Sequence, residues 1–300
     1  MKKRAVSSLL ATLAVVSFIL PALATEPIEA GAALVPEIEL EHAVYLDDVP
    51  QSVEYEMRNG TTYVTVSSFV AMVDPQAVVE EEDGVVTVSS AVVEEVVDDE
   101  GNTANVVQET LSMTVSVEVP YIVANGRYLY AKDSIVILND CVAAPVRILA
   151  KVFNLDVVYD AKIQTVLLTH SEGSGAYLEP GDSYYDADAL FWLSRIIYAE
   201  SGNQSLDGKI AVGNVVMNRV NSPKFPDNIY DVLNQKNQFS PASTLSKRTP
   251  NSGSELAAKL VLDGAQVVPT ALFFNMKGMS SYAAKHRTYV TTIGDHDFFA

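Results

Sequence analysis

Short alternating runs of apolar and polar residues dominate the first half of the chain, from Val64 to Leu168. Tyr63-Val64-Thr65-Val66 and Val85-Val86-Thr87-Val88 are two such runs, and both are rich in β-branched residues. A period of two places the apolar side chains on one face, which is typical of half-buried strands. We therefore predict that this half is mostly β-structure.

An imperfect repeat lies within this β-rich half. Asn59-Gly60 precedes Tyr63-Val64 as Asn125-Gly126 precedes Tyr128-Leu129, and each Asn-Gly pair predicts a hairpin turn. In both cases a helix-like stretch then leads to paired valines, an acidic turn and a closing strand. Two related units are therefore predicted. The paired valines and closing strand are Val78-Val79 and Val85 to Ser89 in the first unit, and Val157-Val158 and Thr165 to Thr169 in the second.

The pattern changes after a segment rich in glycine, serine and proline, residues 171–185, which predicts a flexible linker. Beyond it, apolar residues recur with a helical period. Asp186 or Asp188 can cap a helix that ends near Glu200-Ser201-Gly202. Two further helices are predicted from Gly208 to Val220 and from Glu255 to Leu262, and two short strands at 271–274 and 289–293.

The first 24 residues have the pattern of an export signal. Lys2, Lys3 and Arg4 precede an apolar run that ends at Pro21, and Ala22-Leu23-Ala24 offers a cleavage site. We expect a cleaved signal peptide, an N-terminal linker over 25–41, and a secreted protein that makes no membrane contact after cleavage.

Charge is unevenly divided along the chain. The whole chain has a net charge of −18, and residues 25–181 contain 27 Asp and Glu against 6 Lys and Arg, whereas residues 182–300 contain 11 of each. The acidic half should repel nucleic acid, so no nucleic-acid partner is expected. Cys141 is the single cysteine, which excludes an internal disulfide.

The sequence NGRYLYAKDSIVILNDCVAAPVRILAKVFNLDVVYDAKIQTVLLT, residues 125–169, resembles the copper amine oxidase N-terminal-like domain. The resemblance extends over a β-rich stalk domain from 42 to 170. Copper would need clustered imidazoles, and this region has only His42 and His170, one at each end. We therefore expect a spacer without a metal or other cofactor, which contacts the wall or accessory wall proteins.

Glu200 is the candidate for acid–base chemistry. Leu193, Ile196 and Ile197 precede it by seven, four and three residues, so its carboxyl group shares their face of the helix. An apolar setting and a helix C-terminus both disfavour the charged carboxylate. A carboxylic acid that keeps its proton is what glycosidic cleavage requires. The alternative is a glutamate that turns into solvent.

The segment around Glu200 carries a longer motif. RIIYAESGNQSLDGKIAVGNVVMNRVNSPKFPDNIYDVLNQKNQFSP, residues 195–241, and IGDHDFF, residues 293–299, resemble the SleB-type cell-wall hydrolase family. The resemblance covers 186–300. It implies a small, helix-rich, lysozyme-like or lytic-transglycosylase-like domain in an α+β protein. It also implies that Glu200 is catalytic, that peptidoglycan glycan strands are the substrate, and that the protein acts in the wall or in the spore cortex during germination.

Two departures from the family pattern affect the expected mechanism. Many members have a second glutamate where this chain has Asn203-Gln204, and Met276 and Tyr282 replace a proline and a tryptophan. Hydrolysis ordinarily uses two carboxylates, and Asp207 is better explained as a helix cap. Lytic transglycosylation, in which one glutamate serves as acid and then base, is therefore favoured, with hydrolysis by water left open.

Amide, hydroxyl and aromatic side chains elsewhere in the motif suit carbohydrate binding. Core packing explains the phenylalanines equally well, and Asn214, Asn218 and Asn221 could form a solvated stripe. His286 and His296 lie too far apart in sequence for a usual zinc motif, so no metal is expected. The candidate substrate-binding residues are Gln204, Asn218, Gln238, Phe239, Ser240, Phe274, Asn275 and Tyr282.

Two other functions remain as alternatives. The second domain could be a wall-binding protein without activity, an interpretation that Gln204 supports. It could also be a peptidoglycan amidase or peptidase. That class is disfavoured because residues 186–300 contain no cysteine, no tight set of metal ligands and no Gly-x-Ser-x-Gly elbow.

Overall fold

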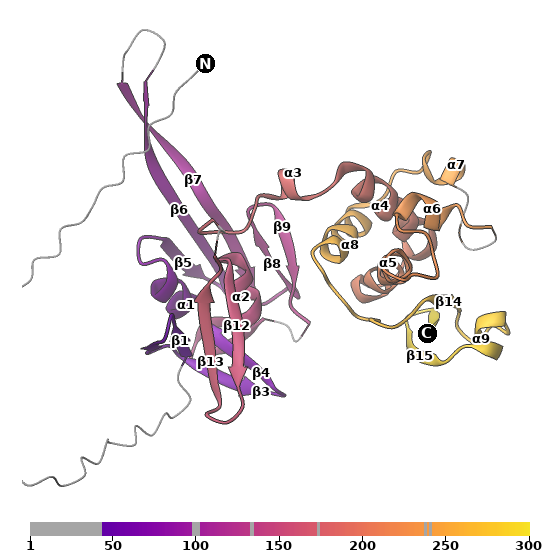
Figure 1. Cartoon of the computed structure of the whole chain (residues 1–300), viewed down its shortest axis with the longest axis horizontal. Helices are drawn as coiled ribbons and strands as arrows, with labels where there is room; N and C mark the ends of the chain where they lie inside the picture. The colour runs from indigo at the N-terminus through magenta and orange to yellow at the C-terminus, as the bar shows by residue number, and fades with distance from the viewer. Residues whose placement is uncertain (1–43, 98–102, 133–134, 173–174, 237–238, 240–241) are drawn as a thin grey trace, which may run out of the picture.

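A computed structural model of the chain describes residues 44–97, 103–132, 135–172, 175–236, 239 and 242–300. The predicted signal peptide and N-terminal linker lie outside these residues. Strands and helices are both abundant, as expected for an α+β protein. A β-rich part, residues 44–170, lies beside a helix-rich part that begins at Gly181 (Figure 1). No helix among the described residues is long and apolar enough to cross a membrane.

The β-rich part contains three sheets with the strand orders β12-β13-β1-β2, β10-β11-β4-β3 and β5-β6-β7-β8-β9. Its main core is an apolar cluster that includes Phe69, Leu111 and Leu168, all fully buried. The elements are β1 (Val44–Leu46), β2 (Val49–Gln51), β3 (Tyr55–Arg58), β4 (Thr61–Thr65), α1 (Val66–Val73), β5 (Val78–Glu82), β6 (Val85–Val97), β7 (Thr103–Ser116), β8 (Tyr121–Ala124), β9 (Arg127–Tyr130), β10 (Val136–Leu138), β11 (Cys141–Pro145), α2 (Val146–Val152), β12 (Leu155–Asp160) and β13 (Thr165–His170).

Both predicted hairpin turns are present. Asn59-Gly60 joins β3 to β4, and Asn125-Gly126 joins β8 to β9. All four residues have positive φ, between 48° and 79°. That backbone matches the right-handed twist of the flanking strands, which explains why the local Asn-Gly signal identified both turns.

The internal repeat exists, but its predicted alignment was wrong at the start. The unit β3-β4-α1-β5-β6 is repeated as β10-β11-α2-β12-β13, and β4 pairs antiparallel with β11. The counterpart of Asn59-Gly60 is therefore Asn139-Asp140, and the Asn125-Gly126 hairpin lies outside the repeat. Asn139 and Asp140 also have positive φ, 48° and 65°, because short polar side chains tolerate this region.

The helix-rich part packs a helical core against a three-stranded sheet with the order β14-β16-β15. The predicted β15 has the observed bounds, whereas β14 begins two residues later than predicted. The elements are α3 (Gly181–Tyr184), α4 (Ala187–Ser201), α5 (Leu206–Val220), α6 (Ile229–Leu233), α7 (Ala242–Leu245), α8 (Ser252–Leu262), β14 (Phe273–Met276), α9 (Tyr282–His286), β15 (Tyr289–Ile293) and β16 (His296–Phe299).

Side-chain caps begin the three long helices. Asp186 caps α4 as predicted, since its carboxylate accepts a hydrogen bond from the Ala189 amide at 2.7 Å. The predicted cap of α5 was wrong. Ser205 accepts from the Gly208 amide, which leaves Asp207 in the first turn. Asn251 caps α8, which therefore starts three residues earlier than predicted.

The segment that joins the two parts is packed rather than flexible, so the interpretation from its composition was wrong over residues 177–185. Leu178 is buried in the β-rich core, and Tyr177 donates a hydrogen bond to Asp74 at 2.6 Å. Gly181 donates its amide to the Asn125 carbonyl at 2.7 Å. A Cβ at Gly181 would lie 2.5 Å from the Gly126 oxygen, so only glycine allows this close approach.

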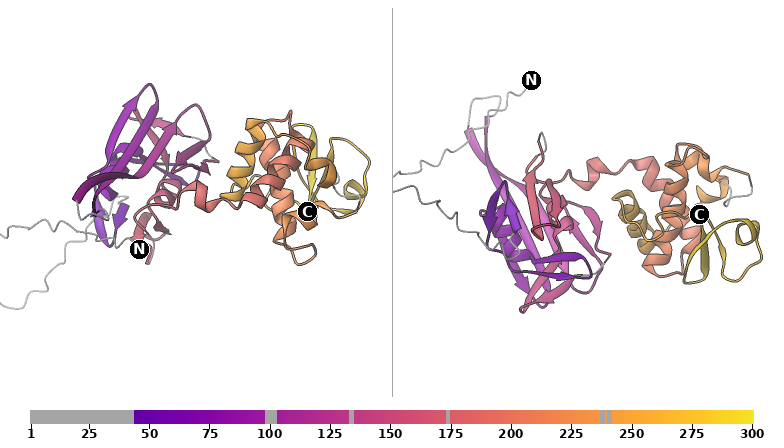
Figure 2. Two further views of the ribbon diagram at one scale, coloured as in Figure 1. Left: turned by 90° about the horizontal axis from the view of Figure 1, so that it is seen from above. Right: turned by 60° about the horizontal axis from the view of Figure 1, so that its bottom comes forward.

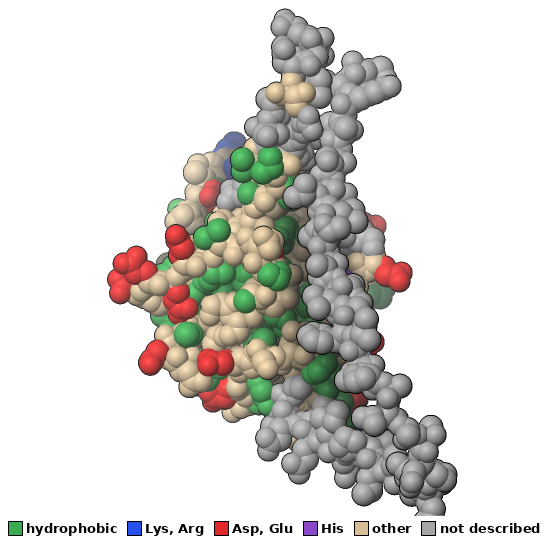
Figure 3. Space-filling view, turned by 90° about the vertical axis from the view of Figure 1, so that its left-hand side faces the viewer, with side chains coloured by type: hydrophobic (Ala, Val, Ile, Leu, Met, Phe, Trp, Pro, Cys, Tyr) green, Lys and Arg blue, Asp and Glu red, His purple; other side chains and the backbone are tan. Residues whose placement is uncertain are grey.

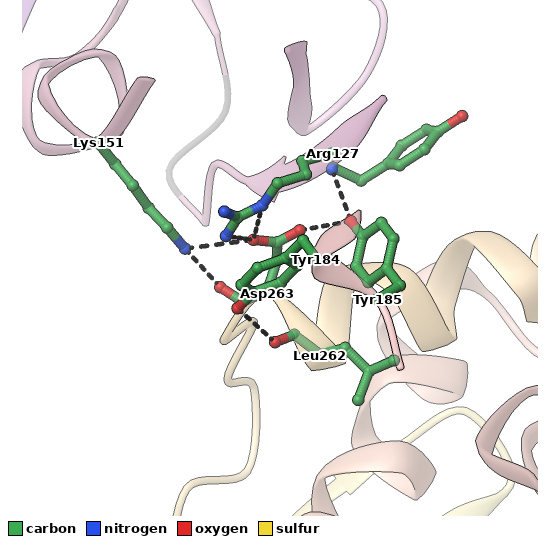
Figure 4. Close-up of polar contacts among 7 residues, drawn as sticks. Arg127, Lys151, Tyr184, Tyr185, Leu262 and Asp263 are labelled. Atoms are coloured by element: carbon green, nitrogen blue, oxygen red, sulfur yellow. Dashed lines mark hydrogen bonds and ion pairs between the residues drawn. The ribbon is translucent and has the colours of Figure 1, made fainter. Parts of the chain in front are cut away.

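One carboxylate holds the two parts together (Figure 4). Asp263 ends α8, and its side chain is completely buried. It accepts from Arg127 Nε at 3.0 Å and also from Arg127 Nη2 and Tyr185 Oη. Lys151 donates to the Asp263 carbonyl at 2.7 Å, and Tyr185 Oη accepts from the Tyr128 amide at 3.0 Å. Both views in Figure 2 show α8 next to the β-rich part, where it packs against β9.

The titration of two side chains in this cluster reflects their burial. Burial lowers the pKa of Lys151, although the Asp263 charge opposes that effect. Burial and the hydrogen bond to Asp263 together raise the pKa of Tyr185 far above its usual range. Tyr185 is therefore a neutral donor, and Arg127 supplies the positive charge that balances the buried carboxylate.

Replacing Asp263 by alanine should destabilise the protein strongly. The change leaves the Arg127 charge buried without its counterion, which costs about 3–5 kcal/mol. We expect a corresponding fall in the free energy of unfolding in urea. The control is Glu56→Ala, because Glu56 pairs with Arg58 at the surface, where water screens the pair and its contribution to stability is small. Equal effects of the two changes would contradict this account of the junction.

Candidate active site

Glu200 lies on the last turn of α4 and is half-buried. The apolar residues that share its face, Leu193, Ile196 and Ile197, are fully buried. Ser201 follows it and donates its hydroxyl to the Ile197 carbonyl at 2.8 Å, which satisfies one of the terminal carbonyls of the helix. The packed face of α4 thus fixes the position of Glu200 at the edge of the core.

His296, the first residue of β16, lies close enough to Glu200 for the two charges to interact. Burial lowers the pKa of His296, while the negative charges of Glu200, Asp295 and Asp297 oppose the shift. The ring packs edge-on against Phe274, with 5.3 Å between centroids. Its Nδ1 is buried and has no hydrogen-bond partner among the described residues. A neutral imidazole therefore stands beside Glu200.

Sequence reasoning weighed His296 only as a metal ligand and missed this position. The signal was present in His296-Asp297-Phe298-Phe299, which follows the turn glycine Gly294 and forms a strand. Because successive side chains of a strand point to opposite faces, His296 and Phe298 share one face of that strand and Asp297 lies on the other. Nothing in the local sequence, however, indicates that β16 returns to the end of α4.

Gln204, one of the predicted substrate-binding residues, makes two hydrogen bonds with Asp295. Its amide Nε2 donates to Asp295 Oδ2 at 2.9 Å, and its Oε1 accepts from the Asp295 amide at 3.0 Å. A Cβ at Gly294 would lie 2.2 Å from Gln204 Oε1, so this turn has to carry glycine. Gln204 therefore ties the α4–α5 loop to the turn that precedes His296.

The asparagines of α5 are structural. Asn214 is fully buried, donates to the Ala265 carbonyl at 2.7 Å and accepts from the Val267 amide at 2.8 Å. Asn218 donates to the carbonyls of Val268 and Ala271, at 3.0 and 2.9 Å. The interpretation of these two residues as a solvated stripe was wrong, because they bind the backbone that leads into β14. Only Asn221 is exposed.

Arg219 is buried among aromatic rings. Its Nε donates to the Leu272 carbonyl at 2.8 Å, and its guanidinium lies 4.8 Å from the Phe239 centroid. Burial lowers the pKa of Arg219 to about 10. In the described part of the chain no carboxylate pairs with it. Phe239 in turn packs against Phe274, at 6.2 Å between centroids, so a row of rings leads from Arg219 to His296.

The remaining predicted substrate-binding residues are dispersed. Asn275 donates to the Met276 carbonyl at 2.8 Å and accepts from Ser281 Oγ at 2.6 Å, so it organises the turn before α9. Tyr282 is 68% exposed and stacks on His286, with 4.6 Å between centroids. Gln238 and Ser240 lie outside the described residues.

Two carboxylates near His296 are already engaged. Asp295 binds Gln204, as described above. Asp297 accepts from Thr292 Oγ1 at 2.5 Å and from the Gly278 amide at 2.8 Å, and these bonds lower its pKa. Asp207, in the first turn of α5, accepts from Tyr130 Oη at 2.9 Å. Each therefore has a structural partner.

Comparisons with known proteins bear on this part of the chain. Residues 203–299 match the family model described as Cell Wall Hydrolase. The chain is 28% identical over 116 residues to the spore cortex-lytic enzyme of Halalkalibacterium halodurans. Residues 203–299 form a cell wall hydrolase domain. This confirms the resemblance to the SleB-type family, although the matched segment begins three residues after Glu200.

The matches to relatives cover less than half of the chain. The alignment with the H. halodurans protein spans 38% of this chain and 35% of that protein, and a Bacillus cereus spore cortex-lytic enzyme matches with 28% identity over 45% of its length. The solved catalytic domain of the germination-specific lytic transglycosylase SleB from Bacillus anthracis aligns over 41% of this chain and all of its own, at 25% identity and a TM-score of 0.37. The B. cereus SleB catalytic domain has a TM-score of 0.36.

The imidazole of His296 should titrate below its usual value of about 6.5, because burial disfavours its charged form. The unfolded chain then binds a proton at this residue at a higher pH than the folded hydrolase domain does. Stability should therefore fall as the pH is lowered through 6.5. NMR titration of labelled histidines measures the pKa directly, with His296→Gln identifying the signal.

A second variant tests whether Glu200 faces His296. The charge of Glu200 favours the imidazolium, so Glu200→Gln should lower the His296 pKa further. Glu255→Gln, an exposed change in α8, is the control and should leave it unchanged. An unaltered His296 titration in Glu200→Gln would refute the proposed proximity.

Gln204→Glu should weaken the hydrolase domain at neutral pH. It replaces the amide donor to Asp295 with a second carboxylate, and losing such a bond costs about 1 kcal/mol before repulsion is added. The loss should shrink near pH 4, where a carboxyl group can again donate a proton. Urea unfolding at both pH values measures this, with the exposed Gln164→Glu as the control. A pH-independent effect would contradict the role assigned to Gln204.

Proposed function

We propose that the hydrolase domain cleaves the glycan strands of peptidoglycan, with Glu200 as its acid and base. Two findings support the substrate: the cell wall hydrolase match over residues 203–299 and the relatives named as spore cortex-lytic enzymes. The single observation that carries the mechanism is the neutral imidazole of His296 beside Glu200. The carboxyl group of Glu200 therefore lies next to an uncharged ring that packs against Phe274, a surface suited to a sugar ring.

The proposed reaction is lytic transglycosylation. Glu200 donates its proton to the bridging oxygen between muramic acid C1 and the next sugar, and the C1–O bond breaks. The resulting carboxylate then removes the proton of the muramic acid 6-hydroxyl, whose oxygen attacks C1 and closes a 1,6-anhydro ring. Glu200 regains its proton and no water is consumed. One carboxylate is sufficient, which agrees with the structural engagement of Asp207, Asp295 and Asp297.

The aromatic row from Phe239 to Phe274 and His296 offers apolar surface next to Glu200. Sugar rings present apolar faces, and aromatic side chains are suited to them. We place α4, α5 and α8 with the three-stranded sheet among lysozyme-like arrangements, with Glu200 at the end of the helix that supplies the acid. In this proposal the protein is exported and acts in the cell wall or the spore cortex.

Glu200→Gln tests the assignment. Loss of the acid–base group should reduce strand cleavage by about 10²–10⁴-fold. Purified peptidoglycan is incubated with the full chain, and the products are analysed by mass spectrometry. Glu255→Gln, an exposed carboxylate of the same domain, should retain wild-type activity.

The products distinguish the alternatives. Anhydro-muropeptides that disappear in Glu200→Gln support transglycosylation. Reducing ends in place of anhydro ends would indicate hydrolysis by water. Free peptides, or no products from the wild type, would overturn glycan cleavage as the function.

A further inference from the structure

The acidic β-rich part has half of its few Lys and Arg residues in one place. Residues 25–181 contain six Lys and Arg, of which Lys132, Arg147 and Lys151 line two adjoining grooves. The face of this part that is turned away from the hydrolase domain shows scattered Asp and Glu and almost no basic side chains (Figure 3). Half of the basic residues of this region therefore line the grooves, although the region as a whole is acidic.

The two grooves have volumes of about 340 and 320 Å³ and share four residues, so they form one continuous channel, here called the cationic groove. The shared residues are Tyr130, Lys132, Arg147 and Ile148. One end lies in the β-rich part, where Tyr159 and Met57 line it. The other end is formed by Asp263 to Gln266 of the helix-rich part.

The cationic groove leads toward the candidate active site. Tyr130, which lines both halves, donates its hydroxyl to Asp207 on α5 at 2.9 Å. Asp207 follows Gln204 by three residues, a stretch of at most about 11 Å. Gln204 binds the turn that carries His296. The Asp263 cluster joins the two parts, so a chain of direct contacts connects the groove to the candidate active site.

The lining has the chemistry of a site for an anionic sugar polymer. Lys132 and Arg147 are exposed and can pair with carboxylates, and Tyr130 and Tyr159 offer partly exposed rings to sugar faces. Densely charged polyanions would be repelled by the surrounding carboxylates, which act over about 10 Å. A mostly neutral strand with widely spaced carboxylates is repelled less, and the cations of the groove can attract its carboxylates.

We propose that the cationic groove binds the peptidoglycan strand beyond the cleavage site, through the carboxylates of its muramic acid peptides. This inference rests on the proposed function, because it assumes that the strand is the substrate. It assigns the β-rich part a direct substrate contact in addition to the spacer role that the sequence predicts. Longer strands should therefore bind more tightly than fragments that fill the catalytic site alone.

The test measures binding without cleavage, so every protein carries Glu200→Gln in the full chain. The groove variant adds Lys132→Glu and Arg147→Glu. The matched control adds Lys162→Glu and Lys224→Glu, which change the net charge equally at exposed positions outside the groove. The probe is insoluble peptidoglycan freed of teichoic acid, and Kd is measured by co-sedimentation at fixed ionic strength. Circular dichroism and urea unfolding establish that each variant is folded.

We expect the groove variant to bind at least tenfold more weakly and the control to bind within twofold of the parent. A milder variant, Lys132→Gln with Arg147→Gln, should show an intermediate loss if the double Glu variant is unstable. Equal binding of groove and control variants would overturn the proposal, as would binding that vanishes when teichoic acid is removed.

A separate readout distinguishes failure of the two proposals. If the protein with Glu200 intact releases no cleavage products but binding depends on the groove, glycan cleavage fails and the groove assignment stands. If products form while binding is independent of the groove, only the groove assignment fails.

Discussion

The carboxylate of Asp263 is the interaction on which the arrangement of the two parts depends. Asp263 is the C-cap residue of α8 in the hydrolase domain. Its carboxylate accepts from Arg127 and Tyr185, and Lys151 donates to its backbone carbonyl. A buried charge is tolerated only when charge and hydrogen bonds are both satisfied. Because its donors come from the β-rich part and the connecting segment, satisfying this one residue requires all three to be in place. The connecting segment is correspondingly packed, with Leu178 in the β-rich core.

Residues of the α4–α5 loop and of the first turn of α5 connect this junction to the candidate active site. Asp207 binds Tyr130 across the junction, and Gln204 binds Asp295 in the turn before His296. The same loop follows Glu200 directly. A short stretch of chain therefore connects the cationic groove, the catalytic candidate and the imidazole beside it. Replacement of the family's second glutamate by Gln204 is consistent with this role, since an amide can donate to Asp295 whereas a carboxylate cannot.

The electrostatics of the site follow from burial more than from charge. His296 is kept neutral although three carboxylates favour its protonation, because desolvation is the larger effect. Asp297 and Asp295 are held in place by hydrogen bonds to neighbouring residues of the fold. In the proposed mechanism the acid and base is Glu200, whose charge acts on His296. Arg219, which is buried under aromatic rings, supports the surface beside it.

Local physics was sufficient for the elements that depend on neighbouring residues. The Asn-Gly turns, the Asp186 cap, the span of α4 and the strand β15 were all predictable, because their causes lie within a few residues. The hydrolase domain, in contrast, was indicated by the resemblance of the motif around Glu200 to a known family. What only the tertiary structure decided were the contacts between distant residues: Arg127 with Asp263 across 136 positions, and Gln204 with Asp295 across 91. The linker composition and the α5 asparagines were misinterpreted because their partners are distant carbonyls and apolar pockets. Sequence patterns record which side chains can be buried, whereas packing decides which partners meet them.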